Sequence, residues 1–120
     1  MKRKIFFVSG SRADYRYLYW IIVYFNKISP NRSELIVTGS HLDDRFGNTV
    51  NEIKNDGLLI NKEIPLIRYH DSNNTIPYQL ATGIKEFSKY FSKTKTDLIV
   101  IAGDRYEILA VAMAAFFLNI

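Results

Sequence analysis

Three short turns in this sequence carry the residues that could do chemistry. In each turn an apolar run ends in a small residue, a glycine and a polar pair: Val-Ser-Gly-Ser-Arg at residues 8–12, Val-Thr-Gly-Ser-His at 37–41 and Ile-Ala-Gly-Asp-Arg at 101–105. The side chains delivered by these turns are Arg12, His41, Asp104 and Arg105. Two guanidinium groups, an imidazole and a carboxylate suit an anionic, phosphate-bearing substrate, with one acid or base among the cations.

The elements that must position these side chains follow from the hydrophobic pattern. We expect strands over residues 5–9, 34–38, 58–64 and 97–102, and helices over residues 13–28 and 48–55, from Pro77 onward and over 105–118. Alternating strands and helices predict an α/β fold with a Rossmann-like parallel sheet. Ligands bind beyond the carboxyl ends of such strands, so the three turns should converge at one edge of the sheet.

Two further segments carry expectations about the chain as a whole. The last predicted helix is apolar on all sides, which predicts burial on all sides, and the chain stops where another strand should begin. We therefore expect residues 1–120 to be the front part of a larger protein, either a natural or an artificial truncation. The polar segment 65–75 is predicted to be a mobile loop.

Composition narrows the class of protein. The 120 residues are 48% hydrophobic, contain no cysteine and carry a net charge of +4. No block of five like charges occurs, which argues against a nucleic-acid partner. The longest apolar stretch, residues 108–118, is shorter than the roughly 18 residues that a membrane span needs, and the amino terminus has no signal-peptide pattern. We expect a cytoplasmic protein without membrane contact.

The turn at residues 103–107 has two interpretations. Asp104 can face substrate at a strand end while Arg105 holds phosphate. Alternatively, Asp104 and Glu107 form a capping box, in which the aspartate satisfies free N–H groups at the start of a helix. The matching turn that ends in Arg12 favours the functional interpretation, and the two roles can coexist.

The turns ending in Arg12 and His41 also have structural alternatives. Residues 10–15 contain one glycine and form neither a dinucleotide fingerprint nor a P-loop, but a phosphate could bind at this helix start beside Arg12. Otherwise Ser11 or Asp14 caps the helix and Arg12 is a surface charge. His41 can bind substrate or transfer a proton, or be purely structural. No second histidine stands at metal-ligand spacing, since His70 is far along the chain, so we expect no metal and no cofactor.

Taken together, these motifs resemble one enzyme family. Ser-Arg-Ala-Asp-Tyr at 11–15, Thr-Gly-Ser-His-Leu at 38–42 with Phe-Gly-Asn-Thr at 46–49, and Gly-Asp-Arg-Tyr-Glu at 103–107 are similar to motifs of the hydrolysing UDP-N-acetylglucosamine 2-epimerases, in particular the branch that makes sialic and nonulosonic acid precursors. The resemblance covers essentially the whole chain. It implies a two-domain fold of the glycosyltransferase-B type, with this chain as part of the N-terminal domain.

The resemblance also implies a reaction and roles for residues. Family enzymes eliminate UDP from a UDP-amino sugar across C1–C2 and then add water, which releases the 2-epimerised sugar. By position, Asp104 matches a catalytic carboxylate, Arg12 and Arg105 match residues near the diphosphate, and His41 matches a histidine near the sugar. The full-length protein is expected to be a homo-oligomer. Arg16 departs from the family pattern, which often has glycine there, and this puts close phosphate approach at that helix start in question.

Two other interpretations remain open at this stage. The uridine-binding C-terminal domain would lie beyond Ile120, so the 120-residue chain alone should not turn over substrate. It could instead be a non-catalytic remnant or a sugar-nucleotide-binding module. A flavodoxin-like or receiver domain would share the strand alternation, but receivers need an acidic cluster after the first strand, where this chain has Ser11 and Arg12.

Overall fold

Strands and helices alternate along the chain in the computed structural model, which describes residues 3–67 and 74–120. In chain order the elements are β1 (Ile5–Ser9), α1 (Arg12–Ile28), β2 (Ser33–Thr38), two short 3₁₀ turns (Gly39–Leu42 and Asp44–Phe46), α2 (Val50–Asn55), β3 (Lys62–Ile64), α3 (Ile76–Lys93), β4 (Leu98–Ile101) and α4 (Tyr106–Phe117). This is the predicted α/β pattern. Of the predicted loop at 65–75, residues 68–73 lie outside the described residues, and so does His70.

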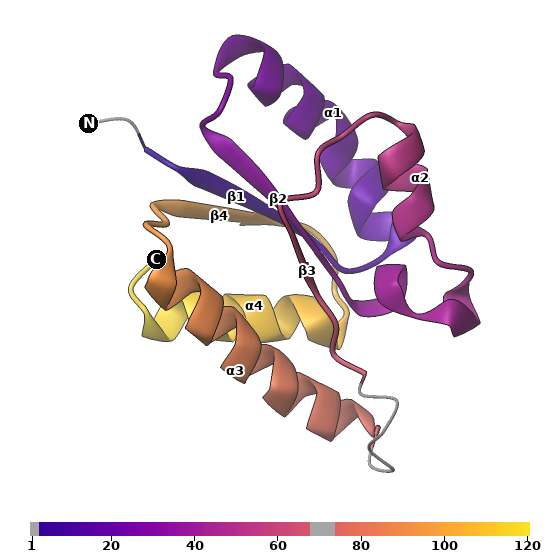
Figure 1. The fold of residues 1–120 in the computed structure, drawn as a ribbon. Coiled ribbons are helices and arrows are strands. Elements are labelled where there is room, and N and C mark those ends of the chain that lie inside the picture. Colours follow the sequence, from indigo (N-terminus) through magenta and orange to yellow (C-terminus); the bar gives the residue numbers. More distant parts are fainter. Residues whose placement is uncertain (1–2, 68–73) are drawn as a thin grey trace.

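The four strands form one parallel sheet in the order β3-β2-β1-β4 (Figure 1). Phe7 of β1 is in register with Leu35 of β2 on one side and with Val100 of β4 on the other. The chain therefore adds strands in one direction from β1 to β3 and then returns to the opposite side of β1. In open α/β sheets, ligands bind where the strand order reverses in this way, here beyond the carboxyl ends of β1 and β4.

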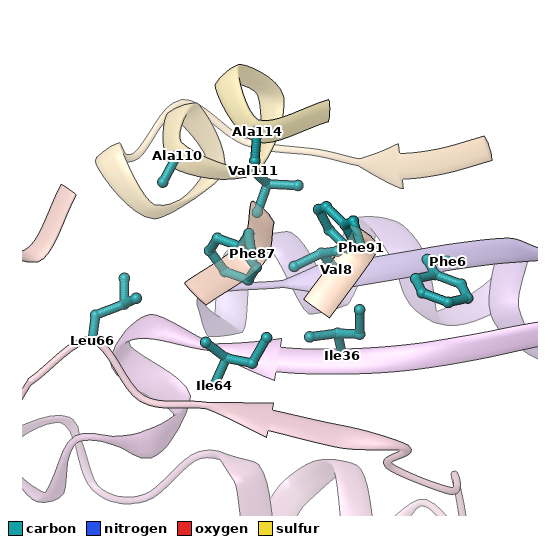
Figure 2. Packing of buried hydrophobic residues seen from close by; sticks show 10 residues of the cluster. All are labelled: Phe6, Val8, Ile36, Ile64, Leu66, Phe87, Phe91, Ala110, Val111 and Ala114. Carbon is teal, nitrogen blue, oxygen red and sulfur yellow. The ribbon is translucent and has the colours of Figure 1, made fainter. Parts of the chain in front are cut away.

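Helices cover both faces of the sheet, and each face has its own apolar core. Side chains alternate along a strand, so Phe6 and Val8 of β1 point to one face and Phe7 to the other. The first face packs against α3 and α4, and Figure 2 shows its buried members: Phe6, Val8, Ile36, Ile64, Leu66, Phe87, Phe91, Ala110, Val111 and Ala114. The second face packs against α1 and α2, with Phe7, Tyr15, Leu18, Ile22, Leu35, Val37, Val50 and Ile53 buried there.

Helix α1 begins where the sequence indicates a cap. Ser11 is the N-cap residue, and its hydroxyl accepts a hydrogen bond from the backbone N–H of Asp14 at 3.3 Å. Such a cap satisfies one of the free N–H groups at a helix start. Tyr15, Leu18 and Ile22, spaced three and four residues apart, are buried against the sheet. The cap and this stripe fix the direction in which α1 leaves the first glycine turn.

Three predicted elements differ in the structure. Strand β3 is confined to Lys62–Ile64 because Asn61 bonds Leu35 through both its backbone N–H and its side-chain oxygen, ending the regular ladder. Helix α2 begins at Val50 rather than at residue 48, since Asn48 adopts a left-handed φ of 49°.

Helix α4 is the third difference. It was predicted to be buried on every side, but Phe116 is 74% and Phe117 is 73% exposed, because only the face with Ala110, Val111 and Ala114 packs against the described part of the chain. No helix in residues 3–67 and 74–120 is both long enough and apolar enough to cross a membrane.

Candidate functional site

The first two glycine turns are in direct contact at the carboxyl edge of the sheet. The backbone N–H of Ser40 donates to the carbonyl oxygen of Gly10 at 2.9 Å, and the Ser40 hydroxyl donates to the same oxygen at 3.2 Å. Gly39 has a φ of +61°, and a Cβ atom at this position would lie 2.6 Å from that carbonyl oxygen. The second turn therefore needs glycine both for its backbone conformation and for its close approach to the first turn.

The third turn joins the first through Asp14, a residue that was singled out only as a possible cap. Its side chain is buried in the first turn of α1, where one carboxylate oxygen accepts the backbone N–H of Gly10 at 3.1 Å. Gly103, with a φ of +115°, passes so close that a Cβ atom there would collide with the other oxygen. Burial raises the pKa of the Asp14 carboxyl, although the hydrogen bond from Gly10 opposes this shift. Asp14 thus links the ends of β1 and β4.

A second buried carboxylate, that of Glu107, lies between the first two turns. Glu107 is in the first turn of α4 and is 0% exposed. Its side chain occupies the space that Cβ atoms at Gly10 and Gly39 would need. One carboxylate oxygen accepts a hydrogen bond from Nε of Arg105 at 2.6 Å, and the other has no partner in the described part of the chain. No local signal in the sequence distinguishes this glutamate from an ordinary one at a helix start.

Asp104 and Arg105 lie exposed beyond the carboxyl end of β4. The Asp104 side chain forms no hydrogen bond or ion pair with another described residue. The N-cap residue of α4 is Arg105, and no side chain caps this helix start. The capping-box interpretation of Asp104 and Glu107 is therefore wrong, because the helix begins one residue later than a cap at Asp104 requires. The hydrogen bond to Glu107 raises the pKa of the Arg105 guanidinium, which stays charged.

His41 lies inside the protein rather than at the open edge. Its Nε2 atom is 2.8 Å from Oγ of Ser9, and its Nδ1 atom is 2.8 Å from Oγ1 of Thr49. The imidazole is fully buried, and this desolvation lowers its pKa to about 4. His41 is consequently neutral at pH 7, and both ring nitrogens are occupied by hydroxyl groups of the protein.

Arg12 follows the first glycine turn, beyond the carboxyl end of β1. It is the first residue of α1, and its guanidinium pairs with Glu52 of α2 at 3.1 Å. Both side chains are largely exposed, so this ion pair contributes little to stability. Arg12 therefore lies at the carboxyl edge of the sheet, directly after the first turn. Its ion-pair partner, Glu52, belongs to α2 and not to the third glycine turn.

A cavity of about 230 Å³ opens next to Arg105. Its wall includes Gly39 and Ser40 of the second turn and Tyr106 of α4, whose hydroxyl donates to Gln79 at 2.5 Å. Asp43, also in the wall, is buried. Its carboxylate accepts hydrogen bonds from Nε and Nη2 of Arg45 at 3.1 and 2.8 Å, which lowers the pKa of the carboxyl. The sequence pattern did not single out these polar groups as site residues. Among residues 3–67 and 74–120 no group of three or more potential ligands could hold a metal ion.

Comparison with known proteins places this arrangement in a family. A family model described as UDP-N-acetylglucosamine 2-epimerase matches residues 26–120. A hydrolysing UDP-N,N'-diacetylbacillosamine 2-epimerase of Legionella pneumophila is 36% identical over 120 residues, which are 100% of this chain and 32% of that protein. A polysialic acid biosynthesis protein of Escherichia coli is 33% identical over 118 residues, covering 98% of this chain and 30% of its own length.

A solved structure agrees in fold. The UDP-GlcNAc 2-epimerase of Neisseria meningitidis, bound to UDP-GlcNAc, superposes with a TM-score of 0.80 at 18% identity, over 98% of this chain and 30% of that one. This likeness confirms the predicted fold class, a Rossmann-like domain of the glycosyltransferase-B type. The chain spans about a third of the length of the curated relatives that it matches. With a family model matching most of its residues, the chain belongs to the UDP-N-acetylglucosamine 2-epimerase family.

Proposed function

We propose that this chain is the N-terminal part of an enzyme that hydrolyses a UDP-amino sugar with inversion at C2. The products are UDP and the free 2-epimerised sugar. The named activity of the Legionella relative supports a diacetamido-trideoxyhexose as the sugar. The Escherichia coli relative, a polysialic acid biosynthesis protein, supports a sialic acid precursor, and the description of the matching family supports UDP-N-acetylglucosamine as its source. We place the enzyme in the cytoplasm, as a homo-oligomer when full length.

The observation that carries this proposal is that Asp104 and Arg105 follow one another in the chain where the strand order reverses. There a carboxylate with no hydrogen bond or ion pair among the described residues stands beside a guanidinium that lines a cavity. Elimination of UDP needs a base for the C2 proton and a positive charge near the departing diphosphate. As the C2–H bond breaks, its electron pair forms the C1=C2 bond, and the C1–O pair leaves with UDP. Water then adds at C1, and a proton returns to C2 from the opposite face.

Asp104 and Arg105 fit two of these tasks. Asp104 is in a position to exchange a proton with the sugar carbon or with the attacking water, and Arg105 stabilises the charge that develops on the diphosphate. Arg12 is proposed as a second phosphate ligand, since its exposed ion pair with Glu52 is weak enough to be exchanged for a diphosphate.

His41 is proposed to support substrate binding indirectly, by holding the second glycine turn in place. Its burial and its bonds to Ser9 and Thr49 do not favour the direct contact with sugar that the resemblance implies. A neutral imidazole in this place joins the end of β1 to the segment before α2. It thereby fixes the second turn, which lines the cavity through Gly39 and Ser40.

The alternative function is a sugar-nucleotide-binding module without catalysis. The coverage of the relatives supports this for the 120-residue polypeptide itself, because two thirds of their length has no counterpart in it. We propose that the isolated polypeptide is inactive. Release of UDP from UDP-N-acetylglucosamine by the purified 120-residue chain, above the level of a vector-only preparation, contradicts this part of the proposal.

Product analysis tests the proposed activity. The full-length gene product is incubated separately with UDP-N-acetylglucosamine and with the UDP-diacetamido-trideoxyhexose, and proton NMR follows UDP and the anomeric signals of the free sugar. Release of UDP together with a 2-epimerised sugar from either substrate supports the proposal and identifies the sugar. Binding of UDP without turnover of either substrate favours the binding module.

A further inference from the structure

Burial of the Glu107 carboxylate costs free energy, and the packing of the fold alone does not explain why it is kept. Burying a charged group costs free energy unless it is fully paired, yet one Glu107 oxygen has no partner in the described residues. Glu107 does not form a capping box either, since no side chain caps α4. Its position near the helix N-terminus recovers part of the cost through the helix dipole.

The surrounding turns leave room for this side chain. Neither Gly10 nor Gly39 could carry a Cβ atom without meeting Cγ of Glu107. Two of the three turns that form the candidate site therefore pack directly on Glu107. The carboxylate is held at a fixed place relative to the ends of β1 and β2, and it cannot swing away without leaving a void.

What this fixed carboxylate touches is Arg105. The contact joins Oε1 of Glu107 to Nε of Arg105 at 2.6 Å, and the Arg105 Cζ atom lies 5.6 Å from the centre of the Tyr106 ring. A guanidinium has a rigid planar fork of five donors, so fixing Nε on one edge sets the direction of the whole group. The Nη1–Nη2 edge is not consumed by Glu107. That edge can bind two phosphate oxygens at once.

We propose that Glu107 is a positioning residue that acts through Arg105. It holds the guanidinium at the carboxyl edge so that the Nη edge receives the diphosphate of the substrate. This inference rests on the proposed function, because it assigns the ligand of Arg105 as a nucleoside diphosphate. A neutral residue at position 107 then weakens binding of the diphosphate, and it does so only while Arg105 is present.

A double-mutant cycle on the full-length protein tests the inference. The wild type, E107Q, R105A and the double variant are titrated with UDP by calorimetry, and unfolding is followed for each. Glutamine keeps the shape of the side chain and removes its charge. We expect E107Q to weaken UDP binding about tenfold, or roughly 1.4 kcal/mol, in the wild-type background and less than about twofold in R105A. The control E63Q removes an exposed carboxylate on β3, which is paired with Lys54 of α2, and should leave UDP affinity unchanged.

The possible outcomes separate the inference from the function on which it rests. If R105A weakens UDP binding while E107Q binds like the wild type, the positioning role is overturned and the proposed function stands. If E107Q loses the same affinity in both backgrounds, Glu107 does not act through Arg105, and the inference is again overturned. If the wild type does not bind UDP, the proposed function fails first.

A second measurement covers the case in which E107Q does not fold. In the wild-type protein the Arg105 Nε–H proton, assigned by its loss in R105A, should give a slowly exchanging signal in ¹⁵N–¹H spectra, because it is bonded to a buried carboxylate. Addition of UDP should move this signal without abolishing its protection. Fast exchange of Nε–H in the wild type overturns the proposal.

Discussion

Oγ of Ser9, the last residue of β1, lies 2.8 Å from Nε2 of His41, and this buried contact joins the first strand to the turn that follows the second. On the opposite side of the ring, Thr49 holds Nδ1. A single neutral imidazole therefore connects the end of β1, the second turn and the residue before α2. A charged imidazolium would donate from both nitrogens, so a hydroxyl that donates to the neutral ring would have to turn and accept instead.

Acid should destabilise the protein through His41. Its pKa is lowered by burial to about 4, against 6.5 when exposed, so the unfolded chain binds more protons between these values. Above pH 6.5 the titration of His41 does not reduce the free energy of unfolding. As the pH falls toward 4, this free energy decreases by an amount on the order of 3 kcal/mol. Urea unfolding of the wild type between pH 4.5 and 7.5 measures the slope.

The variants H41Q and H70A show which histidine causes the pH dependence of stability. H70A removes the other imidazole of the chain, so a slope that survives in H70A and flattens in H41Q belongs to His41. An NMR titration in which the His41 ring protonates above pH 6 contradicts the prediction.

Replacement of Gly39 by alanine should be more destructive than the same change at Gly57. Both residues have positive φ, +61° and +78°, so both variants carry backbone strain of about 1 kcal/mol or more. Only at Gly39 does the new methyl group also meet Gly10 and Glu107, whereas at Gly57 it enters open space. We expect G39A to lose at least about 2 kcal/mol more stability than G57A in urea unfolding. Equal losses mean that the close approach of the two turns is unimportant.

The substitution D104N should reduce kcat of the full-length enzyme by roughly 10²–10⁴-fold, because the amide cannot exchange the proton. Asp104 makes no side-chain bond in the described part of the chain, so stability should change by less than about 0.5 kcal/mol. The matched control is D97N at the other end of β4, where the Asp97 carboxylate accepts the backbone N–H of Lys4 at 2.7 Å. D97N should retain kcat. Unchanged kcat in D104N removes Asp104 from the reaction.

Loss of Arg12 should affect binding rather than turnover. In R12A we expect KM and the UDP inhibition constant to rise about tenfold with kcat within about twofold, because the guanidinium contacts the diphosphate in both ground and transition states. Unfolding should be nearly unchanged, since the Glu52 ion pair is exposed. Arg32, whose guanidinium binds the carbonyl oxygen of Arg3, offers a control in R32A. An unaltered KM and inhibition constant in R12A argue against the phosphate contact.

The architecture and the convergence of the three glycine turns could be predicted because their signals are local. An apolar run followed by a glycine predicts a buried strand and its turn. In a parallel sheet, Gly10, Gly39 and Gly103 then lie at one edge. Ser11 as the helix cap follows from the same reasoning. The substrate and catalytic roles of Arg12, His41, Asp104 and Arg105 stay predictions until the experiments above are made.

What could not be predicted depends on partners that are distant in sequence. Asp14 and Glu107 are charged residues, which are rarely buried, and only the assembled turns show that each fills space left by a glycine. The early end of the β3 ladder depends on Asn61 bonding Leu35, a residue of another strand. The exposure of Phe116 depends on which other residues pack against α4, and the sequence of the helix alone does not show this.

The strand order also determines when the ends of β1 and β4 come together during folding. Strand β1 pairs with β4 across most of the chain, and just before these strands Lys4 bonds Asp97, 93 positions away. Closing so long a loop is entropically slower than joining β1 to β2. The contacts of Asp14 with Gly103 and of Glu107 with Gly10 depend on this closure. In hydrogen exchange, the amides of β4 should therefore open before those of β2, and the site should be lost while the pairing of β1 with β2 persists.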